Sequence, residues 1–215
     1  MIARNLTAPL TKQMRATLSK GIAIALGFPA LFPSAFAQRR PIETAHSAIT
    51  VRVFKAGVFS AFSHNHEISA PIADGSVDIK EQRVSLRVDA TKLRVMDPGT
   101  PASTRAEIQQ TMEGPEALDS RRYPEVSFTS TSISAAGEQR WIVDGNLTLH
   151  GETKPVRVDV SFKGGHYRGS ATIKQSDFAI KPVSVAGGTV KVKDQVRIEF
   201  DVVLSEERRE SRFTK

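Results

Sequence analysis

Apolar and polar residues alternate with a period of two through most of the chain beyond residue 45. In residues 154–162 the apolar positions are Val156, Val158, Val160 and Phe162. Residues 195–204 repeat the pattern with Val196, Ile198, Phe200 and Val202. Because successive side chains of a strand point to opposite faces of a sheet, this spacing predicts strands with one buried face and one face in water.

Weaker alternation predicts further strands, separated by turns. The strands cover residues 48–54, 66–72, 76–80, 83–90, 125–133, 141–150 and 167–175, with turns expected at Asp74-Gly75, Gly137 and Gly164-Gly165. Strands that are neighbours in sequence usually pair, which favours an antiparallel meander. We therefore expect an all-β fold, an antiparallel β-barrel of about eight strands with one short helix inserted between strands.

The helical signal follows the turn at residues 97–101. Thr104 and Glu107 have the spacing of a capping box, and Ile108 and Met112 fall on one helical face. Gly114-Pro115 then ends the pattern. These residues predict about two helical turns that lie across the sheet or close one end of it.

The polar faces of the strands decide which way the barrel is turned. They carry Arg157, Asp159, Arg197, Glu199 and Asp201. In an outer-membrane barrel these side chains would face lipid, at a cost of roughly 2 to 4 kcal/mol for each basic residue near the midplane. The alternation therefore favours a barrel with charges in water and apolar side chains inside.

Residues 1–37 differ in kind from the rest of the chain. They contain basic but no acidic residues, an apolar run at 21–31, and the small residues Ala35 and Ala37 in an A-x-A arrangement. This pattern is typical of an export signal peptide, cleaved near Ala37. The apolar run is shorter than the roughly 18 residues needed to span a bilayer, so no transmembrane span is expected after its removal.

Composition excludes several kinds of function. The formal net charge is +7, but most of the excess lies in the expected leader, and elsewhere Lys and Arg are mixed with Asp and Glu. Without a one-sided basic stripe, nucleic-acid binding is not expected. The chain has no cysteine, which excludes disulfides, Cys-ligated zinc and thiol catalysis. Residues 205–215 have mixed charges and predict a flexible tail.

Several stretches resemble the YceI-like family. They are YPEVSFTSTSI (123–133), VDGNLTLHGETKPVRVDVSF (143–162), IKQSDFAIKP (173–182) and VKVKDQVRIEFDVVL (190–204), and HSAITVRVFKAGVFSAFSHNHEISA (46–70) resembles the first two strands of that family. The resemblance covers about residues 45–204. It implies a lipocalin-like barrel domain, exported to the periplasm, that binds a polyisoprenoid or related amphipathic lipid in an apolar tunnel. Two departures bear on the ligand: residues 105–124 replace a common R-D-x-H-L type stretch, and SHNH (63–66) replaces other polar residues.

The inward rows are the candidate lipid-contacting residues. They are Phe62, Leu147, Leu149, Val158, Val160, Phe162, Ile198, Phe200 and Val202. We expect their burial from the alternation. The same rows would pack against one another in a filled barrel, so alternation alone does not predict contact with a ligand.

Two histidines one residue apart, His64 and His66, follow the first expected strand. If residues 62–72 form one strand, both share a face with Ile68 and lie at a barrel mouth, where they could hydrogen-bond a lipid head group such as a quinone carbonyl or a phosphate. Alternatively, they bind a metal ion together with His150. A third interpretation gives them a local structural role. Lys181, Lys191 and Lys193 could attract an anionic head group at a barrel mouth, or could simply belong to a solvated hairpin.

The sequence favours a binding protein over an enzyme. No nucleophile elbow or convergent set of acids is present. We expect an exported carrier or sequestering protein whose partner is a polyisoprenoid or isoprenoid quinone, with no other cofactor. The alternative is a metal-binding protein or metal-dependent enzyme using His64, His66 and His150. The oligomeric state stays open, a homodimer included.

Overall fold

The computed structural model describes residues 39–56, 65–185 and 190–205; the expected leader and nearly all of the expected tail lie outside these ranges. The strands are β1 (Arg39–Pro41), β2 (Ala48–Ala56), β3 (His66–Ser69), β4 (Ile72–Asp78), β5 (Arg83–Asp89), β6 (Arg94–Val95), β7 (Glu125–Gly137), β8 (Arg140–Leu149), β9 (Glu152–Lys163), β10 (His166–Lys174), β11 (Ser184–Val185) and β12 (Val190–Val203). The helices are α1 (Ala102–Glu113) and the short 3-10 turns η1 (Thr44–His46), η3 (Ala90–Lys92) and η4 (Gln175–Phe178).

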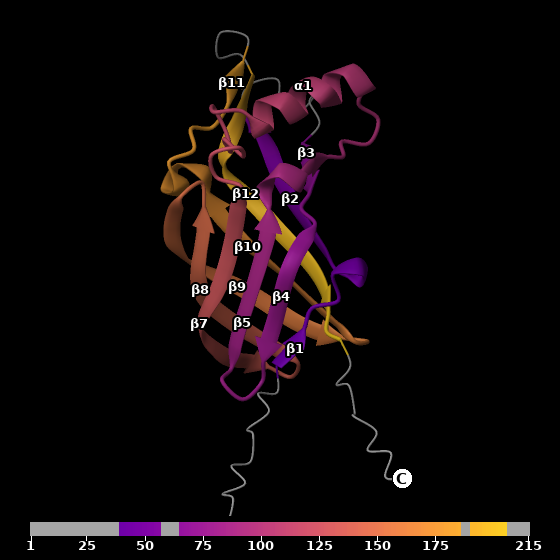
Figure 1. The fold of residues 1–215 in the computed structure, drawn as a ribbon, viewed down its shortest axis with the longest axis vertical. Coiled ribbons are helices and arrows are strands. Elements are labelled where there is room, and N and C mark those ends of the chain that lie inside the picture. Colours follow the sequence, from indigo (N-terminus) through magenta and orange to yellow (C-terminus); the bar gives the residue numbers. More distant parts are fainter. Residues whose placement is uncertain (1–38, 57–64, 186–189, 206–215) are drawn as a thin grey trace, which may run out of the picture. The chain divides into compact units, whose positions relative to one another are not determined.

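The strands form one antiparallel sheet that curls into a barrel (Figure 1). Its order is β1-β4-β5-β7-β8-β9-β10-β12-β2-β3-β6, and β11 pairs with β12 beside this path. The helix α1 lies at one end of the barrel, and the β4–β5, β7–β8 and β9–β10 turns lie at the other (Figure 1). We call these the helix end and the turn end. The prediction of an all-β antiparallel barrel with one inserted helix is confirmed in this form.

Residues at the end of β1 contact the residues that follow β12. Ile42 and Leu204 form an isolated antiparallel bridge. The Ser205 amide donates to the Pro41 carbonyl over 2.9 Å, and the Arg40 Nε donates to the Ser205 carbonyl over 3.1 Å. We call residues 40–42 with 204–205 the clasp, because they join the first strand of the order to the end of β12.

Side chains alternate along the strands as predicted. In β9, Val156, Val158 and Val160 are shielded, whereas Arg157 and Asp159 are exposed. The outward charges pair across strands, for example Arg157 with Asp144 at 2.9 Å. The barrel therefore has an apolar interior and a charged outer surface.

The strand count was wrong: within the described residues the sheet has twelve strands, where about eight were predicted. Three of the strands, β1, β6 and β11, have only two or three residues, too few for a periodic signal. The expected strand 66–72 is divided, since β3 ends at Ser69 and β4 begins at Ile72.

The turn predicted at Asp74-Gly75 is also wrong, because both residues lie within β4. A side chain at position 75 would place its Cβ 2.6 Å from the Cδ1 of Ile42. Glycine is therefore needed here for the close approach of Ile42 and not for a change of chain direction. The turns predicted at Gly137 and Gly164-Gly165 are confirmed: both connect antiparallel strands, and all three glycines have positive φ.

The helix exists as predicted, but it begins earlier and has three turns. Its N-cap is Pro101, without a side-chain cap, so Thr104 lies inside the first turn and the capping-box interpretation was wrong. Gln109 fastens α1 to the exposed edge of β6. Its Oε1 accepts from the Val95 amide, and its Nε2 donates to the Leu93 carbonyl, both over 2.8 Å.

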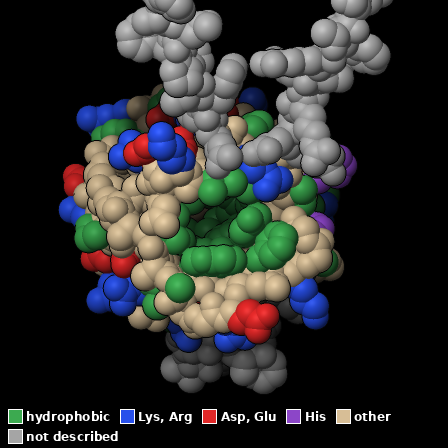
Figure 2. Space-filling model, turned by 90° about the horizontal axis from the view of Figure 1, so that it is seen from below, with side chains coloured by type: hydrophobic (Ala, Val, Ile, Leu, Met, Phe, Trp, Pro, Cys, Tyr) green, Lys and Arg blue, Asp and Glu red, His purple; other side chains and the backbone are tan. Residues whose placement is uncertain are grey.

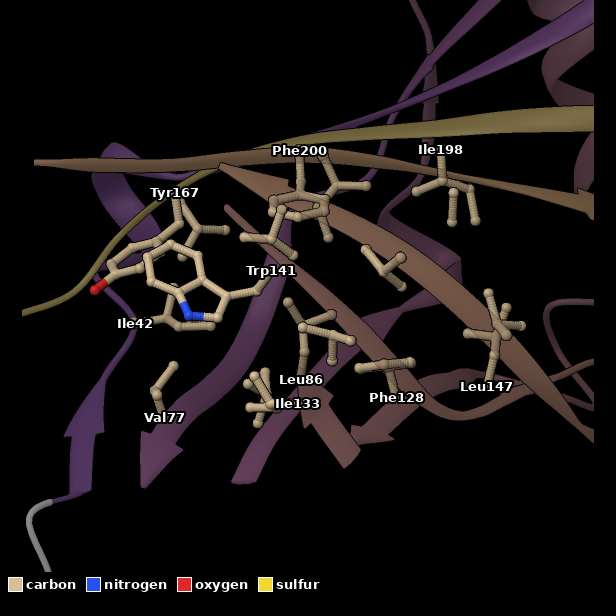
Figure 3. A pocket seen from close by; sticks show the side chains of 18 of the residues that line it. Ile42, Val77, Leu86, Phe128, Ile133, Trp141, Leu147, Tyr167, Ile198 and Phe200 are labelled. Carbon is tan, nitrogen blue, oxygen red and sulfur yellow. The ribbon is translucent and has the colours of Figure 1, made fainter. Parts of the chain in front are cut away.

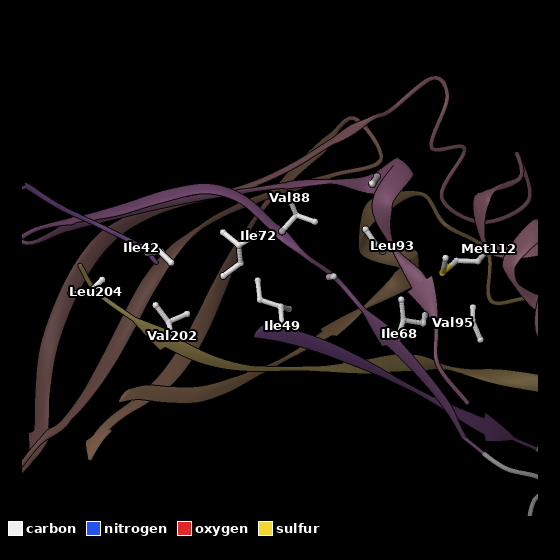
Figure 4. Packing of buried hydrophobic residues seen from close by; sticks show 12 residues of the cluster. Ile42, Ile49, Ile68, Ile72, Val88, Leu93, Val95, Met112, Val202 and Leu204 are labelled. Carbon is white, nitrogen blue, oxygen red and sulfur yellow. The ribbon is translucent and has the colours of Figure 1, made fainter. Parts of the chain in front are cut away.

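The largest packed cluster lies where β1–β6 meet β12 and α1. It consists of Ile42, Ile49, Ile68, Ala70, Ile72, Val88, Ala90, Leu93, Val95, Met112, Val202 and Leu204 (Figure 4). A second cluster, Leu147, Ile173, Phe178, Ile180 and Val196, includes η4. These clusters hold the barrel wall and α1 together, but they do not fill the interior.

Candidate functional site

The turn end of the barrel encloses a cavity of about 370 Å³. Seen from this end, hydrophobic side chains surround a central hollow (Figure 2). Its lining includes Ile42, Val77, Leu86, Phe128, Ile133, Trp141, Tyr167, Ile198 and Phe200, which come from opposite walls (Figure 3). Asp78 and Gln82 add polar groups on the β4–β5 side. The turn-end cavity is therefore an apolar space with a mouth.

A second cavity, of about 520 Å³, lies at the helix end. Its apolar lining includes Val51, Val53, Ile68, Val88, Leu93, Ile108, Met112, Leu118, Leu149, Ile173 and Ile180. This helix-end cavity also has polar lining residues: Lys55, His66, Thr104, Glu107, Thr111, Gln175 and Lys191. The two cavities thus differ in polarity.

Val126, Leu147 and Ile198 line both cavities. The two spaces therefore adjoin at the middle of the barrel. Along β12 and the residue after it, the apolar lining runs from Val192 to Leu204. This corresponds to about 40 Å of strand and about 30 Å along the axis of a barrel with tilted strands. The interior therefore holds two adjoining apolar cavities, which we together call the channel, and the helix end has the larger number of polar lining residues.

Two glycines shape the walls of this channel. A Cβ at Gly145 would lie 2.6 Å from the Cε2 of Phe128, and one at Gly169 would lie 2.9 Å from the Cε1 of Phe200. Both rings line the turn-end cavity. The missing side chains thus let the two rings approach the neighbouring strands closely.

The structure brings most of the predicted inward residues to the channel. Leu147, Leu149, Val158, Val160, Ile198, Phe200 and Val202 line one or both cavities. Leu147 and Val202 are buried, whereas the others are only partly buried because they border open space. Phe162 does not line either cavity; its ring packs against Tyr167 with the centroids 4.6 Å apart. Phe62 lies outside the described residues.

The predicted histidines do not come together. His66 lines the helix-end cavity, and its Nδ1 lies 2.6 Å from the Oδ2 of Asp97. His150 occupies the β8–β9 turn, where its Nδ1 bonds to the Phe178 carbonyl at 3.1 Å and its ring packs on Tyr123. His64 lies outside the described residues. Within residues 39–56, 65–185 and 190–205, no three His, Asp or Glu side chains are grouped to hold a metal ion.

Comparison with known proteins agrees with this architecture. Residues 41–204 match the YceI-like domain, which covers most of the chain. The chain belongs to the YceI-like family. The resemblance predicted from the strand motifs is thereby confirmed.

Curated relatives of this YceI-like protein include two UPF0312 proteins. One, from Pseudomonas savastanoi pv. phaseolicola, is 35% identical over 104 residues, which is 43% of this chain and 54% of the relative, so the match spans about half of that protein. One from Vibrio parahaemolyticus is 26% identical over 86% of this chain and 97% of the relative. These names state no enzymatic activity.

The solved structure of BcnA from Burkholderia cenocepacia has the same fold. It superposes with a TM-score of 0.55 at 21% sequence identity, covering 77% of this chain and 99% of that chain. At this identity the likeness establishes the architecture of the YceI-like barrel and leaves its ligand open.

Asp97 is the site residue that sequence reasoning missed. It is only 3% exposed, and besides His66 it binds the Glu67 amide through Oδ1 at 2.7 Å. Its position depends on the pairing of β3 with β6, two strands far apart in the chain. The turn predicted at residues 97–101 includes Asp97, but nothing in that stretch of sequence indicates that Asp97 contacts His66.

Charges on the outer wall next to this site form a separate network. Arg52 bonds to Glu199 at 2.8 Å and to Glu67 at 2.9 Å. The hydrogen bond from Arg52 lowers the pKa of Glu199, and the positive charges of Arg52 and Arg197 act in the same direction against desolvation. About a third of the Glu199 side chain is exposed, so this network contributes little to stability.

None of the helices in the described part of the chain is long and apolar enough to cross a membrane.

Proposed function

We propose that this YceI-like protein is a carrier or sequestering protein that holds a polyisoprenoid or isoprenoid quinone in its barrel, without catalysing a reaction on it. The observation that carries the proposal is the pair of adjoining apolar cavities, of about 370 and 520 Å³, along the barrel axis. Protein interiors are ordinarily packed without voids of this size. Volumes in this range are typical of sites for small apolar ligands.

The driving force is the removal of an apolar chain from water. Each buried CH₂ contributes up to about 0.8 kcal/mol. Because the cavities meet end to end at Val126, Leu147 and Ile198, an extended flexible chain fits the space better than a compact ligand. An isoprenoid supplies such a chain, with branched methyl groups that match the Val, Ile and Leu side chains of the wall.

The unequal polarity of the two cavities gives the ligand a direction. The helix-end cavity has the His66, Lys55 and Lys191 side chains among its lining, whereas the turn-end cavity is almost wholly aliphatic and aromatic. A polar head group binds most favourably beside hydrogen-bonding groups, since burying it elsewhere leaves it unpaired. We therefore place the head group at the helix end and the tail toward the turn end.

We also propose that the protein is exported to the periplasm after removal of residues 1–37. The support is the basic, then apolar, then small-residue order of that segment. Cell fractionation with an antibody to the barrel, and the mass of the recovered protein, test this directly. Recovery of the full-length chain from the cytoplasm alone would contradict it.

The function is tested by purifying the protein without detergent from its own cell envelope, extracting it with organic solvent and analysing the extract by mass spectrometry. An isoprenoid in stoichiometric amount is the expected result. The control is the same protein unfolded, extracted and refolded, which should carry no lipid and should bind geranylgeraniol when it is added back. Native extracts without any isoprenoid, together with failure of the refolded protein to bind geranylgeraniol, would refute the proposal.

A further inference from the structure

The polar end of the channel contains a buried His–Asp pair. The Nδ1 of His66 lies 2.6 Å from the Oδ2 of Asp97, and the two side chains are 16% and 2% exposed. His66 also borders the helix-end cavity. The carboxylate is therefore shielded from solvent, and among the described residues that line this cavity it is His66, and not Asp97, that borders the space.

The fold dictates this pairing. Ile68 pairs with Val95 between antiparallel β3 and β6, and continuing the register by two residues places Asp97 opposite His66. Asp97 begins a turn in which the Thr100 amide donates to its carbonyl over 3.1 Å and Gly99 has φ 84°. Asp97 itself has φ 21°, an unusual value for a residue other than glycine. The surrounding structure thus holds Asp97 in a strained backbone conformation that keeps its carboxylate against the ring.

The hydrogen bonds of Asp97 indicate which nitrogen of the His66 ring carries the proton. A carboxylate only accepts hydrogen bonds. Its Oδ1 accepts from the Glu67 amide at 2.7 Å, so its Oδ2 accepts the proton on the Nδ1 of His66. In a neutral imidazole only one nitrogen carries a proton, so Nε2 keeps its lone pair. In the neutral ring, therefore, Nε2 can only accept a hydrogen bond from a ligand.

We propose that the Nε2 of His66 accepts a hydrogen bond from a hydroxyl on the lipid head group, so that the channel selects isoprenoid alcohols or hydroquinones over ethers, aldehydes, quinones and phosphate esters of the same chain. Asp97 acts as a positioning residue that fixes the tautomer of His66. This inference rests on the proposed function, because it names the head group of the lipid that the channel binds.

The ligand side of the test compares three probes with identical tails: geranylgeraniol, its methyl ether and geranylgeranial. Their affinities for the delipidated protein are measured in the same buffer. Only the alcohol can donate a hydrogen bond, so it should bind roughly tenfold more tightly than the ether or the aldehyde, as one satisfied buried hydrogen bond predicts. Geranylgeranyl phosphate then tests whether a phosphate head group is accepted. A hydroquinone and a quinone, each with a decyl chain, test whether the hydroxyl can come from a hydroquinone.

The protein side of the test is Asp97→Asn. The amide of the variant keeps its Oδ1 on the Glu67 amide and turns its NH₂ toward the Nδ1 of His66. That nitrogen must then accept, and the ring proton moves to Nε2. Alcohol and ether oxygens both accept from an N–H, so the alcohol-to-ether affinity ratio should fall from roughly ten to about one.

Two further variants complete the design. Asp89→Asn is the matched control, because the Asp89 carboxylate accepts from Thr91 and is absent from both cavity linings. It should leave the ratio unchanged. His66→Phe removes the acceptor nitrogen and leaves Asp97 unchanged, and it should also bring the alcohol-to-ether affinity ratio to about one. The test therefore does not depend on the folding of a single variant.

The outcomes separate this inference from the proposed function. Tight binding of all three probes with equal affinity, or tighter binding of the phosphate ester than of the alcohol, overturns the hydroxyl acceptor while leaving a lipid carrier. An unchanged ratio in both Asp97→Asn and His66→Phe also overturns it. Failure of the wild-type protein to bind any probe overturns both.

Discussion

Closing the passage between the two cavities should limit the length of chain that the barrel can hold. Ile198 lines both cavities and lies across the channel from Leu147 (Figure 3). In Ile198→Trp the indole would occupy this passage. Ile198 also packs against both hydrophobic clusters, but the added ring can extend into the cavities that this residue borders, so we expect a melting temperature close to that of the wild-type protein.

The size of the effect follows from the apolar surface that each isoprene unit buries. At about 0.3 kcal/mol per non-hydrogen atom, a five-carbon unit contributes about 1.5 kcal/mol, or about tenfold in Kd. In the wild-type protein, affinity should rise by about this factor from geraniol to farnesol and again to geranylgeraniol. In Ile198→Trp the rise should stop once the chain reaches the passage, so the deficit grows with chain length to about tenfold or a hundredfold.

Displacement of a fluorescent apolar probe by the three alcohols measures this series. Ile79→Trp is the matched control, because Ile79 also borders the turn-end cavity but is 48% exposed. It should leave the chain-length dependence intact. Parallel curves for Ile198→Trp and the wild-type protein, with geraniol and geranylgeraniol weakened equally, would refute the idea of one continuous channel.

Two further predictions concern the barrel wall. Gly145→Ala would place a Cβ 2.6 Å from the Cε2 of Phe128 and 2.7 Å from a neighbouring carbonyl oxygen, so it should cost about 2 kcal/mol and lower Tm by about 4–8 °C in calorimetry. Arg52→Met should raise the pKa of Glu199 toward its usual value near 4.5, as NMR titration of the carboxyl would detect. The lowered pKa of Glu199 stabilises the fold only while its carboxyl is ionised, so this stabilisation is lost as pH falls below 4.5. The difference in the free energy of unfolding between Arg52→Met and wild type, below about 1 kcal/mol, should therefore shrink in acid. A difference that persists in acid would contradict this assignment.

The periodic parts of the fold were predictable from the sequence. Alternation in β9 and β12 correctly identified the inward rows, because each of these strands is long enough to repeat its pattern several times. The short strands β1, β6 and β11 were missed because two or three residues carry no period. These short strands form because they pair with neighbouring strands of the sheet.

Local signals failed where a distant residue decided the outcome. Asp74-Gly75 has the composition of a turn, but Ile42 packs against Gly75 and the strand continues. Thr104 and Glu107 have the spacing of a capping box, but Pro101 begins the helix, and Gln109 fastens it to β6. Neither contact can be inferred from nearby residues.

The candidate site was predicted in part for the same reason. The position of His66 next to an apolar row followed from the period of a strand. Its partner Asp97 depends on the β3–β6 pairing, and the separation of His66 from His150 depends on the path of the whole sheet. Chemistry that arises from such long-range pairing leaves no local pattern to recognise.

The clasp sets a boundary on how the chain can be trimmed before it folds. The Arg40 side chain and the Pro41 carbonyl bond to Ser205, Ile42 forms a bridge pair with Leu204, and Arg39 pairs with Asp78 of β4. A protease that cuts ahead of Arg39 spares every one of these bonds, whereas a cut a few residues later removes them together. The cleavage proposed near Ala37 would therefore fall just ahead of the residues that close the wall.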